Sequence, residues 1–497
     1  MADKCGMEET GFSMRDSMKI KLIVFITLLL LLCPGCGSKT EPEAGQPNLL
    51  LISVDTLRAD RLGCYGYKRP TSPTIDRLAE EGVLFENAIA TSPQTTPSHM
   101  SIITGFYPRA HNVYMWGRDE NGTYSGRVLS GEIPTLAEIL KGYGYTNVAF
   151  TGGANVAGKI GFDRGFEIYD EESNSAAAVE WLRENAEEQF FLFYHTYFTH
   201  APYLPLPPYG SRYDPAYLGK IPSYDELTEE LGVVKGELWS GIWQALYNRF
   251  WSKVNPADPA DRYHLHALYD ECIGYVDAVF IKELIDTLRT EGILDRTLIV
   301  FTSDHGEEFF EHGRKEHDSI YGEVVRVPLI MRLPGALPGG MRIEQLVRGI
   351  DIMPTILELL GIPLDVEIQG TSLLAAATDG KELNLKAHSD YNDFFPPVID
   401  SIRSGPWFLL MDQRTRSGGE PGDGSLPRFF QLFNTDDDPG ETRNLAEKYP
   451  EVAARLRTEL RALRIESSRK HAEEGADQEK AAVDRWNVER LKALGYL

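Results

Sequence analysis

Short apolar runs that end at a charged residue recur along this chain and predict buried strands. One run covers residues 48–54 and is followed by Asp55, and another covers residues 297–303 and is followed by Asp304 and His305. Both runs are rich in strand-forming residues and are bounded by polar turns, which is typical of strands that lie inside a parallel sheet. The pattern therefore predicts an α/β fold with these two runs in one sheet.

The acidic residues after the two strands form the first candidate site. In an open α/β sheet, ligands bind beyond the carboxyl ends of the strands, so Asp55, Asp304 and His305 are expected to meet at one edge. A buried aspartate without a partner is rarely tolerated. Two carboxylates and an imidazole suit a divalent cation such as Ca²⁺, Mn²⁺ or Zn²⁺. The sequence predicts one such ion, and a second bound ion is an alternative.

A candidate nucleophile lies between the two strands. Residues 95–105 read as a helix with Pro97 in its first turn and Gly105 at its end. The hydroxyl of Thr95 would then lie at the amino end, where free amides and the helix dipole favour an anion. The alternative is that Thr95 is an ordinary helix cap.

Several motifs in this order resemble the sulfatase family of the alkaline phosphatase superfamily. The motifs lie in residues 48–66, 95–108, 301–334 and 351–363, and in the C-terminal segment 430–446. The resemblance spans residues 47–460. It implies an α/β sandwich around a large mixed, mostly parallel sheet, with a smaller C-terminal α+β subdomain and a metal-dependent esterase centre.

The chain departs from the family pattern at five places. Thr95 stands at the Cys or Ser position that becomes formylglycine, and His99 stands at the following arginine position. Thr56 replaces an aspartate, residues 151–156 replace a lysine-containing segment, and His305 replaces an asparagine. Threonine cannot become the aldehyde, because its β-carbon carries a methyl group. The centre is similar to those of the phosphodiesterase, phosphoethanolamine-transferase and lipoteichoic-acid-synthase branches.

The resemblance also implies roles for further side chains. His200 would contact the oxyanion or the leaving group, with His195 behind it. His312 and His317, in the loop after the metal pair, are further catalytic candidates, and Lys315 is a weaker one; either of these two histidines could instead help to hold a second metal. Each histidine could also be structural.

Two residues beside the predicted metal ligands have less defined roles. Thr56 would lie next to the cation as a substrate-binding or supporting residue. His99 would orient the nucleophile or contact the substrate anion, unless it is a solvated helix position.

The chemistry that fits this set is ester hydrolysis through Thr95. A cation coordinated by Asp55, Thr95, Asp304 and His305 would lower the pKa of the hydroxyl, and a covalent threonyl intermediate would be released by water. Phosphate or phosphonate esters are favoured over sulfate esters because formylglycine is impossible. The alternatives are a sulfuric ester hydrolase without formylglycine, a phosphoryl-group transferase, and a catalytically inactive binding protein. A hydrolase is preferred over a transferase because transferases of this branch usually follow several membrane helices.

The first residues predict an address outside the cytoplasm. A basic start at Lys19 and Lys21 precedes the apolar run 22–32, and Gly35-Cys36 resembles a bacterial lipobox. Residues 1–36 are therefore interpreted as a signal peptide with Cys36 as the lipidated residue. Residues 1–17 are interpreted as a mis-called start. The expected location is a bacterial membrane, facing the periplasm or the cell surface, with secretion without an anchor as the alternative.

The mature chain is predicted to have one catalytic body with additions. The expected divisions are a tether 37–47, a catalytic domain 48–380 with an insertion 203–262, a C-terminal subdomain 381–460 and a charged helical tail 461–497. The 497 residues are 42% hydrophobic, enough to bury a large core. The net charge of −24 argues against nucleic acid as a partner. The expected substrate is an anionic ester of a sugar, a lipid or a small metabolite.

Four local predictions remain. The insertion could be a lid, or its Trp239, Trp243 and Trp251 could stack on a sugar or pack inward. Residues 270–290 are predicted to form one amphipathic helix, and residues 450–480 a solvated helix. Short strands are predicted over residues 387–390, 401–411 and 428–433. Cys64 and Cys272 are expected not to form a disulfide.

Overall fold

The computed structural model describes most of the chain after the predicted leader. The described residues are 46–114, 117–118, 124–172, 175–232, 242–391, 399–412, 429–474 and 480–482. The chain divides into residues 1–45 and a compact unit of residues 46–497, and every described residue belongs to the second. The predicted signal peptide, the lipobox and most of the tether therefore lie outside the described residues.

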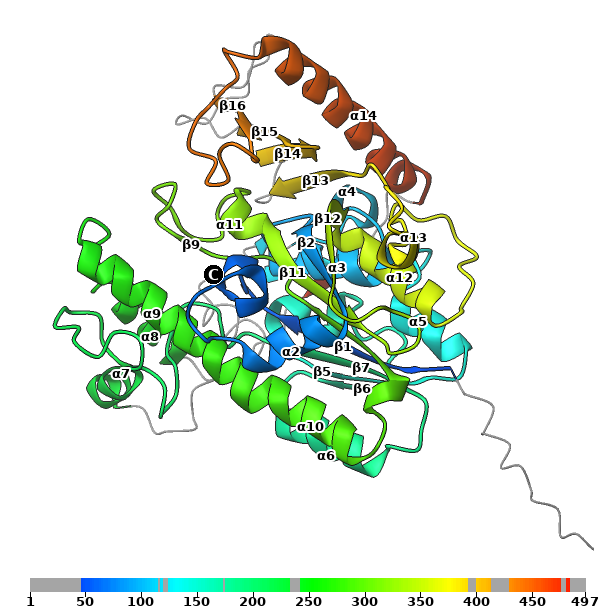
Figure 1. The fold of residues 1–497 in the computed structure, drawn as a ribbon, viewed down its shortest axis with the longest axis horizontal. Coiled ribbons are helices and arrows are strands. Elements are labelled where there is room, and N and C mark those ends of the chain that lie inside the picture. Colours follow the sequence, from blue (N-terminus) through cyan, green and yellow to red (C-terminus); the bar gives the residue numbers. More distant parts are fainter. Residues whose placement is uncertain are drawn as a thin grey trace, which may run out of the picture. The chain divides into compact units, whose positions relative to one another are not determined.

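An eight-stranded sheet forms the centre of the compact unit (Figure 1). Its strands, in spatial order, are β12 (Met341–Arg348), β2 (Val83–Ile89), β11 (Arg326–Arg332), β8 (Thr297–Thr302), β1 (Asn48–Val54), β7 (Phe190–Thr196), β5 (Thr146–Phe150) and β6 (Ile168–Asp170). Only β11 runs antiparallel to its neighbours in this sheet. The predicted α/β fold with a mixed, mostly parallel sheet is confirmed.

The two apolar runs that opened the sequence analysis are neighbours in this sheet. Strand β1 pairs in parallel with β8 on one side and with β7 on the other. Ser53 lies opposite Thr302 in β8 and opposite His195 in β7. All residues of β1 and β8 are buried. Their carboxyl ends therefore deliver Asp55 and Asp304 to the same edge.

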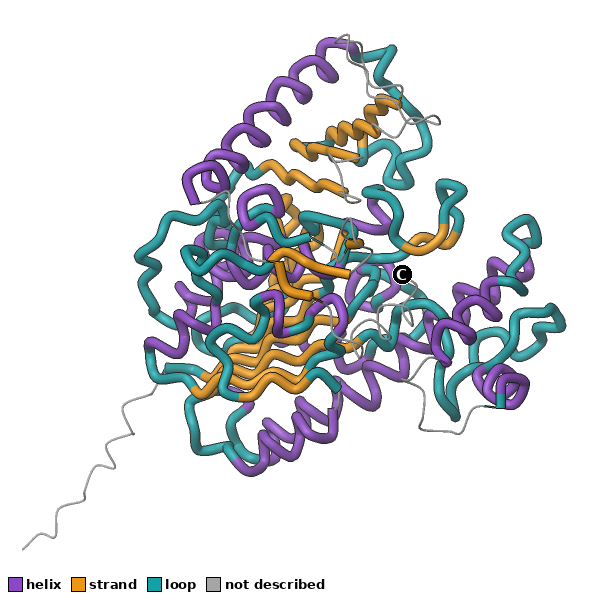
Figure 2. Tube along the Cα trace, turned by 180° about the vertical axis from the view of Figure 1, so that it is seen from behind, coloured by secondary structure: helices purple, strands orange, loops and turns teal. Residues whose placement is uncertain are grey.

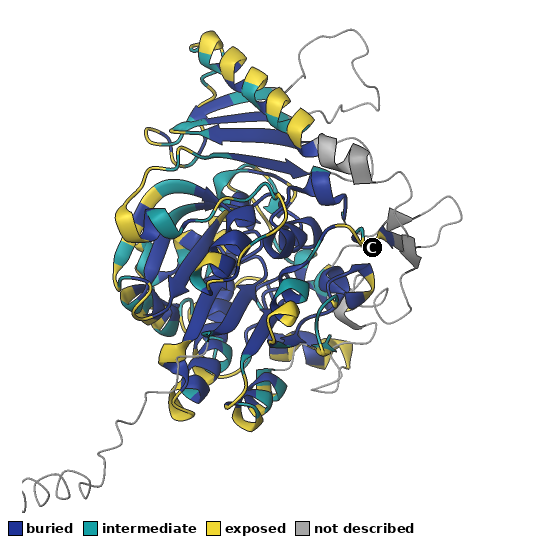
Figure 3. Cartoon of the chain, turned by 90° about the vertical axis from the view of Figure 1, so that its right-hand side faces the viewer, coloured by how far each residue is buried: buried dark blue, intermediate teal, exposed yellow. Residues whose placement is uncertain are grey.

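Helices cover both faces of the sheet, and the side chains of β1 alternate between the two apolar cores. One core contains residues of α3 (Thr95–Thr104), α5 (Leu136–Gly142), α12 (Ile352–Leu359) and α13 (Leu374–Asp379). The other contains residues of α2 (Pro73–Glu81), α6 (Ser175–Glu184), α9 (Pro259–Tyr275) and α10 (Lys282–Thr290). Figure 3 shows the buried strands between these helices. Burial on both faces explains why the strands read as continuous apolar runs.

Shorter elements connect this framework. They comprise α4 (Pro108–His111), α7 (Tyr224–Leu231), α8 (Ile242–Trp251), α11 (Gly322–Val325), β9 (Glu308–Phe309), β10 (Lys315–Glu316), β3 (Gly117–Arg118), β4 (Tyr124–Arg127) and β17 (Lys480–Ala482). Single 3₁₀ turns occur at Ala59–Arg61, Gly63–Tyr65, Ala154–Val156, Gly158–Ile160, Leu294–Arg296 and Gly349–Asp351.

The predicted helix over residues 270–290 is longer than expected and contains a π-helical segment. It begins at Pro259, and Val276–Ile281 joins α9 to α10. Within that segment the Asp277 carboxylate accepts the backbone N–H of Thr74 at 3.0 Å and of Ile75 at 2.9 Å. The wider turn thus places a buried carboxylate at the amino end of α2, where it satisfies free amides.

A second, antiparallel sheet forms the C-terminal part, with α14 (Pro450–Glu474) beside it (Figure 2). Its strands are β13 (Lys386–Tyr391), β14 (Ile399–Ser404), β15 (Trp407–Asp412) and β16 (Phe429–Asn434). The single strand predicted over 401–411 is wrong, because a turn at Gly405, whose φ is +55°, separates β14 from β15. The predicted helix and tail from residue 450 are confirmed for the helix, which is α14, whereas Lys480, at the end of the predicted range, pairs as a strand with β4.

The insertion contains α7 and α8, and its described tryptophan packs inward. The Trp251 ring lies 5.5 Å from that of Phe250 and 6.2 Å from that of Tyr203. Trp239 and the side chain of Trp243 lie outside the described residues. Cys64 and Cys272 are both free thiols, as expected. Among the helices in the described ranges, none combines the length and the apolar character that a membrane span requires.

Candidate active site

Three predicted ligands converge beyond the ends of β1 and β8. One ligand atom from each of Asp55, Asp304 and His305 lies within 4.8 Å of the others, and all three side chains are buried. Asp55 follows β1 directly, and Asp304 lies two residues after the end of β8. The parallel pairing of the two strands therefore creates the group, as the sequence predicts.

Thr95 joins this group from the amino end of α3. The helix begins at Thr95 itself and Gln94 occupies the cap position, so the interpretation of Thr95 as the cap is wrong by one residue. The Thr95 hydroxyl donates to Asp55 Oδ1 at 3.1 Å and lies 3.3 Å from Nε2 of His305. The first helical position thus directs the hydroxyl toward the predicted metal ligands.

The unsatisfied carboxylate oxygens of this group fit a divalent cation. Oδ2 of Asp55 and Oδ2 of Asp304 are buried without a hydrogen bond. Burial raises the pKa of Asp55 well above its usual range, and the neighbouring Asp304 raises it further. Burial also acts against ionised Asp304, but the imidazoles of His305 and His99 outweigh it and keep the pKa of Asp304 below its usual range. A bound cation would offset the repulsion between the two carboxylates.

The tautomer of His305 agrees with a role as a ligand. Its Nδ1 lies 3.0 Å from the backbone carbonyl of Gly306. Because a carbonyl oxygen can only accept, Nδ1 carries the proton and Nε2 presents a lone pair toward the group. This donor set of carboxylates, an imidazole and a hydroxyl suits Ca²⁺, Mn²⁺ or Zn²⁺.

Thr56 supports the metal ligands mainly through its backbone. Its φ of +57° is uncommon for a threonine and turns its N–H toward Oδ1 of Asp304, at 3.3 Å. Its hydroxyl donates to the backbone carbonyl of Asp55 at 2.7 Å, and the hydroxyl of Thr199 donates to the same carbonyl. Where the family pattern has an aspartate, Thr56 therefore contributes a hydroxyl to the Asp55 carbonyl and no further carboxylate.

His99 lies inside the protein, so the alternative of a solvated helix position is wrong. Its Nδ1 donates to the carbonyl of Thr95 at 3.0 Å and lies 3.3 Å from Oδ2 of Asp304. Its Nε2 accepts from the hydroxyl of Ser53 at 2.9 Å. The imidazole of His195 packs edge-on against it, with ring centres 4.9 Å apart. His99 therefore connects the first residue of α3 to Asp304.

His200 and His317 form a pair on another side of His305. Their Nε2 atoms lie 3.3 Å apart, and the ring of His317 lies 4.5 Å from that of His305. Nδ1 of His200 donates to the carbonyl of Ala201 at 2.8 Å, which directs Nε2 toward His317. Burial lowers the pKa of both imidazoles. Both predicted histidines thus reach the site.

Two other candidates make their described contacts elsewhere. The ring of His312 stacks on Tyr321 at 3.6 Å, and its Nε2 lies 3.4 Å from Glu323. Lys315 lies over the ring of Trp251, with its Nζ 4.1 Å from the ring centre. Neither contact joins the Asp55 group, so the geometry gives these two residues no place beside the nucleophile.

Asn155 is a candidate that the sequence analysis missed. It is fully buried, and neither the nitrogen nor the oxygen of its side-chain amide has a hydrogen bond to any described residue. Its carbonyl accepts the hydroxyl of Thr96 at 2.7 Å, and its N–H donates to the hydroxyl of Tyr197 at 3.2 Å. It therefore stands next to the start of α3, within the segment that replaces the family's lysine. Buried amides without partners are rare, which points to a ligand contact. The replaced segment was the available signal.

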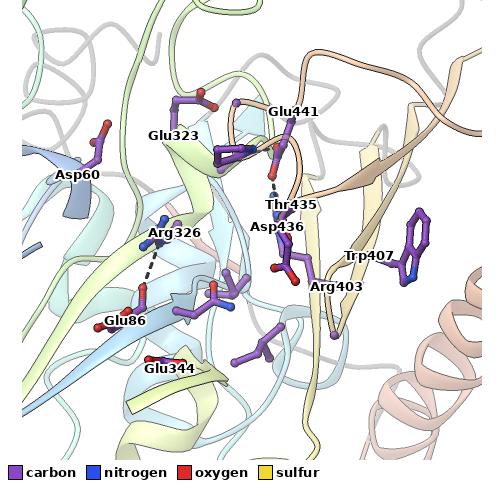
Figure 4. A pocket seen from close by; sticks show the side chains of 17 residues that line it. Asp60, Glu86, Glu323, Arg326, Glu344, Arg403, Trp407, Thr435, Asp436 and Glu441 are labelled. Atoms are coloured by element: carbon purple, nitrogen blue, oxygen red, sulfur yellow. Dashed lines mark hydrogen bonds and ion pairs between the residues drawn. The ribbon is translucent and has the colours of Figure 1, made fainter. Parts of the chain in front are cut away.

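A separate surface cleft of about 490 Å³ lies between the main sheet and the C-terminal sheet (Figure 4). Its charged lining consists of Asp60, Glu86, Glu323, Glu344, Asp436 and Glu441 with Arg326 and Arg403. Arg403 is paired with Glu441 at 2.6 Å. Six carboxylates against two guanidinium groups make this cleft unfavourable for an anion.

The fold and this site define a hydrolase that acts on ester bonds. Residues 47–362 match the protein family described as Sulfatase, and the chain belongs to that family. Arylsulfatase K of Bos taurus is 26% identical over 481 residues, which cover 85% of this chain and 82% of that protein.

Solved structures share the fold at lower identity. BT4656, solved with its substrate D-glucosamine-2-N,6-O-disulfate, has a TM-score of 0.65 and 18% identity, covering 87% of this chain and 99% of the other. The phosphonate monoester hydrolase of Agrobacterium radiobacter has a TM-score of 0.63 and 19% identity, covering 85% and 96%. The same architecture therefore carries both sulfatases and phosphonate hydrolases.

A thermal-shift experiment tests the cation site. Ca²⁺, Mn²⁺ or Zn²⁺ added to chelator-treated protein should raise the unfolding temperature, because an ion that binds only the folded state at 100 times its Kd adds about 2.7 kcal/mol. Asp304→Asn should abolish the shift. Asp277→Asn, which changes a buried aspartate under α2, should lower the unfolding temperature but keep the shift. A full shift in Asp304→Asn would place the ion elsewhere.

Proposed function

We propose that this protein hydrolyses phosphate or phosphonate esters with the help of a divalent cation and with Thr95 as the nucleophile. The observation that carries the proposal is the position of the Thr95 hydroxyl, 3.1 Å from Asp55 Oδ1 and 3.3 Å from His305 Nε2, at the start of α3. A cation held by Asp55, Thr95, Asp304 and His305 would supply positive charge against the charge that develops on the nucleophile and on the transferred group.

In the first step, Oγ1 of Thr95 forms a bond to phosphorus. Its proton passes to Oδ1 of Asp55, the acceptor of its hydrogen bond. His99 holds the first residue of α3 in place through its contact with the Thr95 carbonyl. The nucleophile and its proton acceptor are thus ordered before the ester arrives, which lowers the entropic cost of attack.

The leaving group departs from the side of the histidine pair. The bond between phosphorus and the leaving oxygen breaks with its electron pair on that oxygen, and the singly protonated, cationic form of the His200–His317 pair gives that oxygen a proton and becomes neutral. In the second step, a water molecule gives a proton back to the same pair and attacks phosphorus. The Thr95 oxygen leaves and recovers its proton from Asp55.

Neutral groups are available to hold the oxygens of the transferred group. The side-chain amide of Asn155 is buried without partners near α3, and the amino end of α3 offers backbone N–H groups. Lys315 cannot take this role while its ammonium pairs with Glu316 at 2.5 Å. We assign Asn155 the contact that the family's lysine segment would otherwise make.

The chemistry of threonine favours phosphorus over sulfur as the reacting centre. A threonyl ester carries no neighbouring hydroxyl on the same carbon that could expel a sulfate, so release would require attack on the bound group itself. Water can attack a phosphoryl or phosphonyl ester of threonine in this way. A sulfate ester is the second candidate, because the named relatives include arylsulfatase K and BT4656.

The proposed substrate is drawn from a structural neighbour, and the proposed location from the first residues of the chain. We assign the substrate to anionic esters of sugars, lipids or small metabolites. The sulfated glucosamine bound by BT4656 makes a sugar the first class to test. The basic and apolar leader with Cys36 supports a lipid anchor on the outer side of a bacterial membrane.

Substitutions at Thr95 test the nucleophile with matched p-nitrophenyl phosphonate, phosphodiester and sulfate esters. Thr95→Ala should lower kcat/KM by about 10³-fold or more, and Thr95→Ser should stay within about tenfold, because either hydroxyl can attack. Phosphorus esters should be the faster substrates. If Thr95→Ala turned over at the wild-type rate, a water molecule would be the attacking group, and if the sulfate ester were fastest, the second candidate would replace the first.

Asn155→Ala tests the contact to the transferred group. Loss of one such donor should lower kcat by about 10²–10³-fold with little change in unfolding temperature. Asn147→Ala is the matched control. Its buried amide donates to the carbonyls of Ala137 and Gly165 at 2.6 and 2.9 Å, so this variant should lose stability but keep kcat. Equal kcat in Asn155→Ala and wild type would remove Asn155 from the site.

Cys36→Ser tests the lipid anchor in cells of a bacterial host. The variant should move from the membrane fraction to the soluble fraction and lose labelling by a fatty-acid probe, while its specific activity stays unchanged. Cys33→Ser, three residues earlier, should remain labelled and membrane-bound. Membrane-bound, labelled Cys36→Ser protein would contradict the lipobox.

A further inference from the structure

We infer that α8, the helix of the insertion, positions His317 by holding the two residues before it, Lys315 and Glu316. Tyr247 and Trp251 on α8 are then positioning residues for the reaction. The inference rests on the proposed function, in which His317 shares the proton that the leaving group receives. This positioning role of the insertion 203–262 differs from the two functional roles considered from the sequence, a lid and tryptophans that stack on a sugar.

The backbone before His317 adopts a conformation that needs support. The backbone φ of Glu316 is +64°, which lies in the left-handed region that residues other than glycine rarely adopt. Its strand β10 is only two residues long and pairs with β9, Glu316 opposite Glu308. Such a strained residue persists when its surroundings hold it, and it often marks a functional position.

Side-chain contacts to α8 supply that support. The Tyr247 hydroxyl donates to the Glu316 carboxylate. The Lys315 ammonium lies 2.5 Å from the same carboxylate and 3.2 Å from the Tyr247 hydroxyl. Tyr247, Lys315 and Glu316 thus form a closed set of three polar groups, and one of them belongs to the insertion.

Aromatic rings fix the other side of Lys315. Its Nζ lies 4.1 Å from the ring centre of Trp251 and 5.1 Å from that of Tyr247, within the range of a cation–π contact. Trp251 in turn packs edge-on against Phe310, the residue that follows β9, with ring centres 6.3 Å apart. Contacts to α8 are therefore made from both strands of the hairpin, where they flank its loop. This attachment explains why Lys315 does not face the nucleophile.

His317 follows this anchor directly in the chain. Its Nε2 lies 3.3 Å from that of His200, so a small movement of Glu316 would change the geometry of the pair. Displacements of about 1 Å can cost about 10²-fold in rate. Loss of the anchor should therefore impair proton delivery while leaving Asp55, Thr95 and Asp304 in place.

The test compares esters that differ only in the basicity of the leaving group. A p-nitrophenolate departs without a proton, whereas an alkoxide needs one, and a general acid contributes about 10²–10⁴-fold. Three variants are assayed, Tyr247→Phe, Trp251→Leu and Glu316→Gly. We expect kcat for the alkyl ester to fall about 10–100-fold and kcat for the p-nitrophenyl ester to fall less than about threefold.

Two of these variants separate positioning from other effects. Tyr247→Phe removes a single oxygen atom, so the fold is retained. Glu316→Gly adopts the left-handed conformation without strain but has no side chain for Tyr247. If backbone shape alone placed His317, Glu316→Gly would behave as wild type, which would overturn the inference.

Two controls complete the design. Tyr217→Phe also removes a hydroxyl of the insertion that donates to a carboxylate, Asp261 at 2.6 Å, and should leave both rates unchanged. His317→Ala defines the full loss for the alkyl ester. If His317→Ala lowers both esters equally, the proton role proposed for His317 fails. Suppose instead that His317→Ala lowers kcat for the alkyl ester alone. If the α8 variants then match wild type, or lower kcat for both esters equally, only the positioning role of α8 fails.

Discussion

Two buried carboxylates stand close together at the ends of neighbouring parallel strands, and their repulsion must be balanced by the rest of the site. Asp55 and Asp304 reach this position because β1 and β8 pair in register inside the sheet. Four groups contact the two carboxylates: the imidazoles of His305 and His99, the backbone N–H of Thr56 and the hydroxyl of Thr95. Among the described residues, Oδ2 of each aspartate is buried without a hydrogen bond, and a bound cation would complete the balance.

Much of this arrangement could be predicted from local pattern. Apolar runs ending at Asp55 and Asp304 indicated buried strands, and the geometry of open α/β sheets then required their ends to converge. The helix start at Thr95 also followed from Pro97 and Gly105. These features are decided by near neighbours in sequence and by one rule of sheet topology, so they are visible without coordinates.

The parts that could not be predicted depend on contacts between distant segments. The apolar and polar positions of α9 do not show that a π-helical segment follows it and brings the Asp277 carboxylate to the backbone amides at the start of α2. Lys315 was a site candidate through the family resemblance alone. Its actual ring partners, Trp251 and Tyr247, lie on α8, more than sixty residues earlier in the chain, so the sequence does not reveal them. Asn155 was marked only by the departure of residues 151–156 from the family pattern, because an unsatisfied amide becomes evident only when its burial is known. In each case the deciding quantity is a tertiary distance.

The site therefore combines two kinds of support with different tolerance to change. The proposed nucleophile and cation ligands lie at the ends of buried strands and at the start of a buried helix. His317, the histidine proposed to serve the leaving group, follows a two-residue strand that contacts a helix of the insertion. Loops and insertions vary more readily than sheets, because fewer buried contacts depend on them. If the proposed roles hold, changes in α8 and its hairpin would alter how the leaving group receives its proton, while the proposed attack by Thr95 and the proposed cation ligands would stay the same.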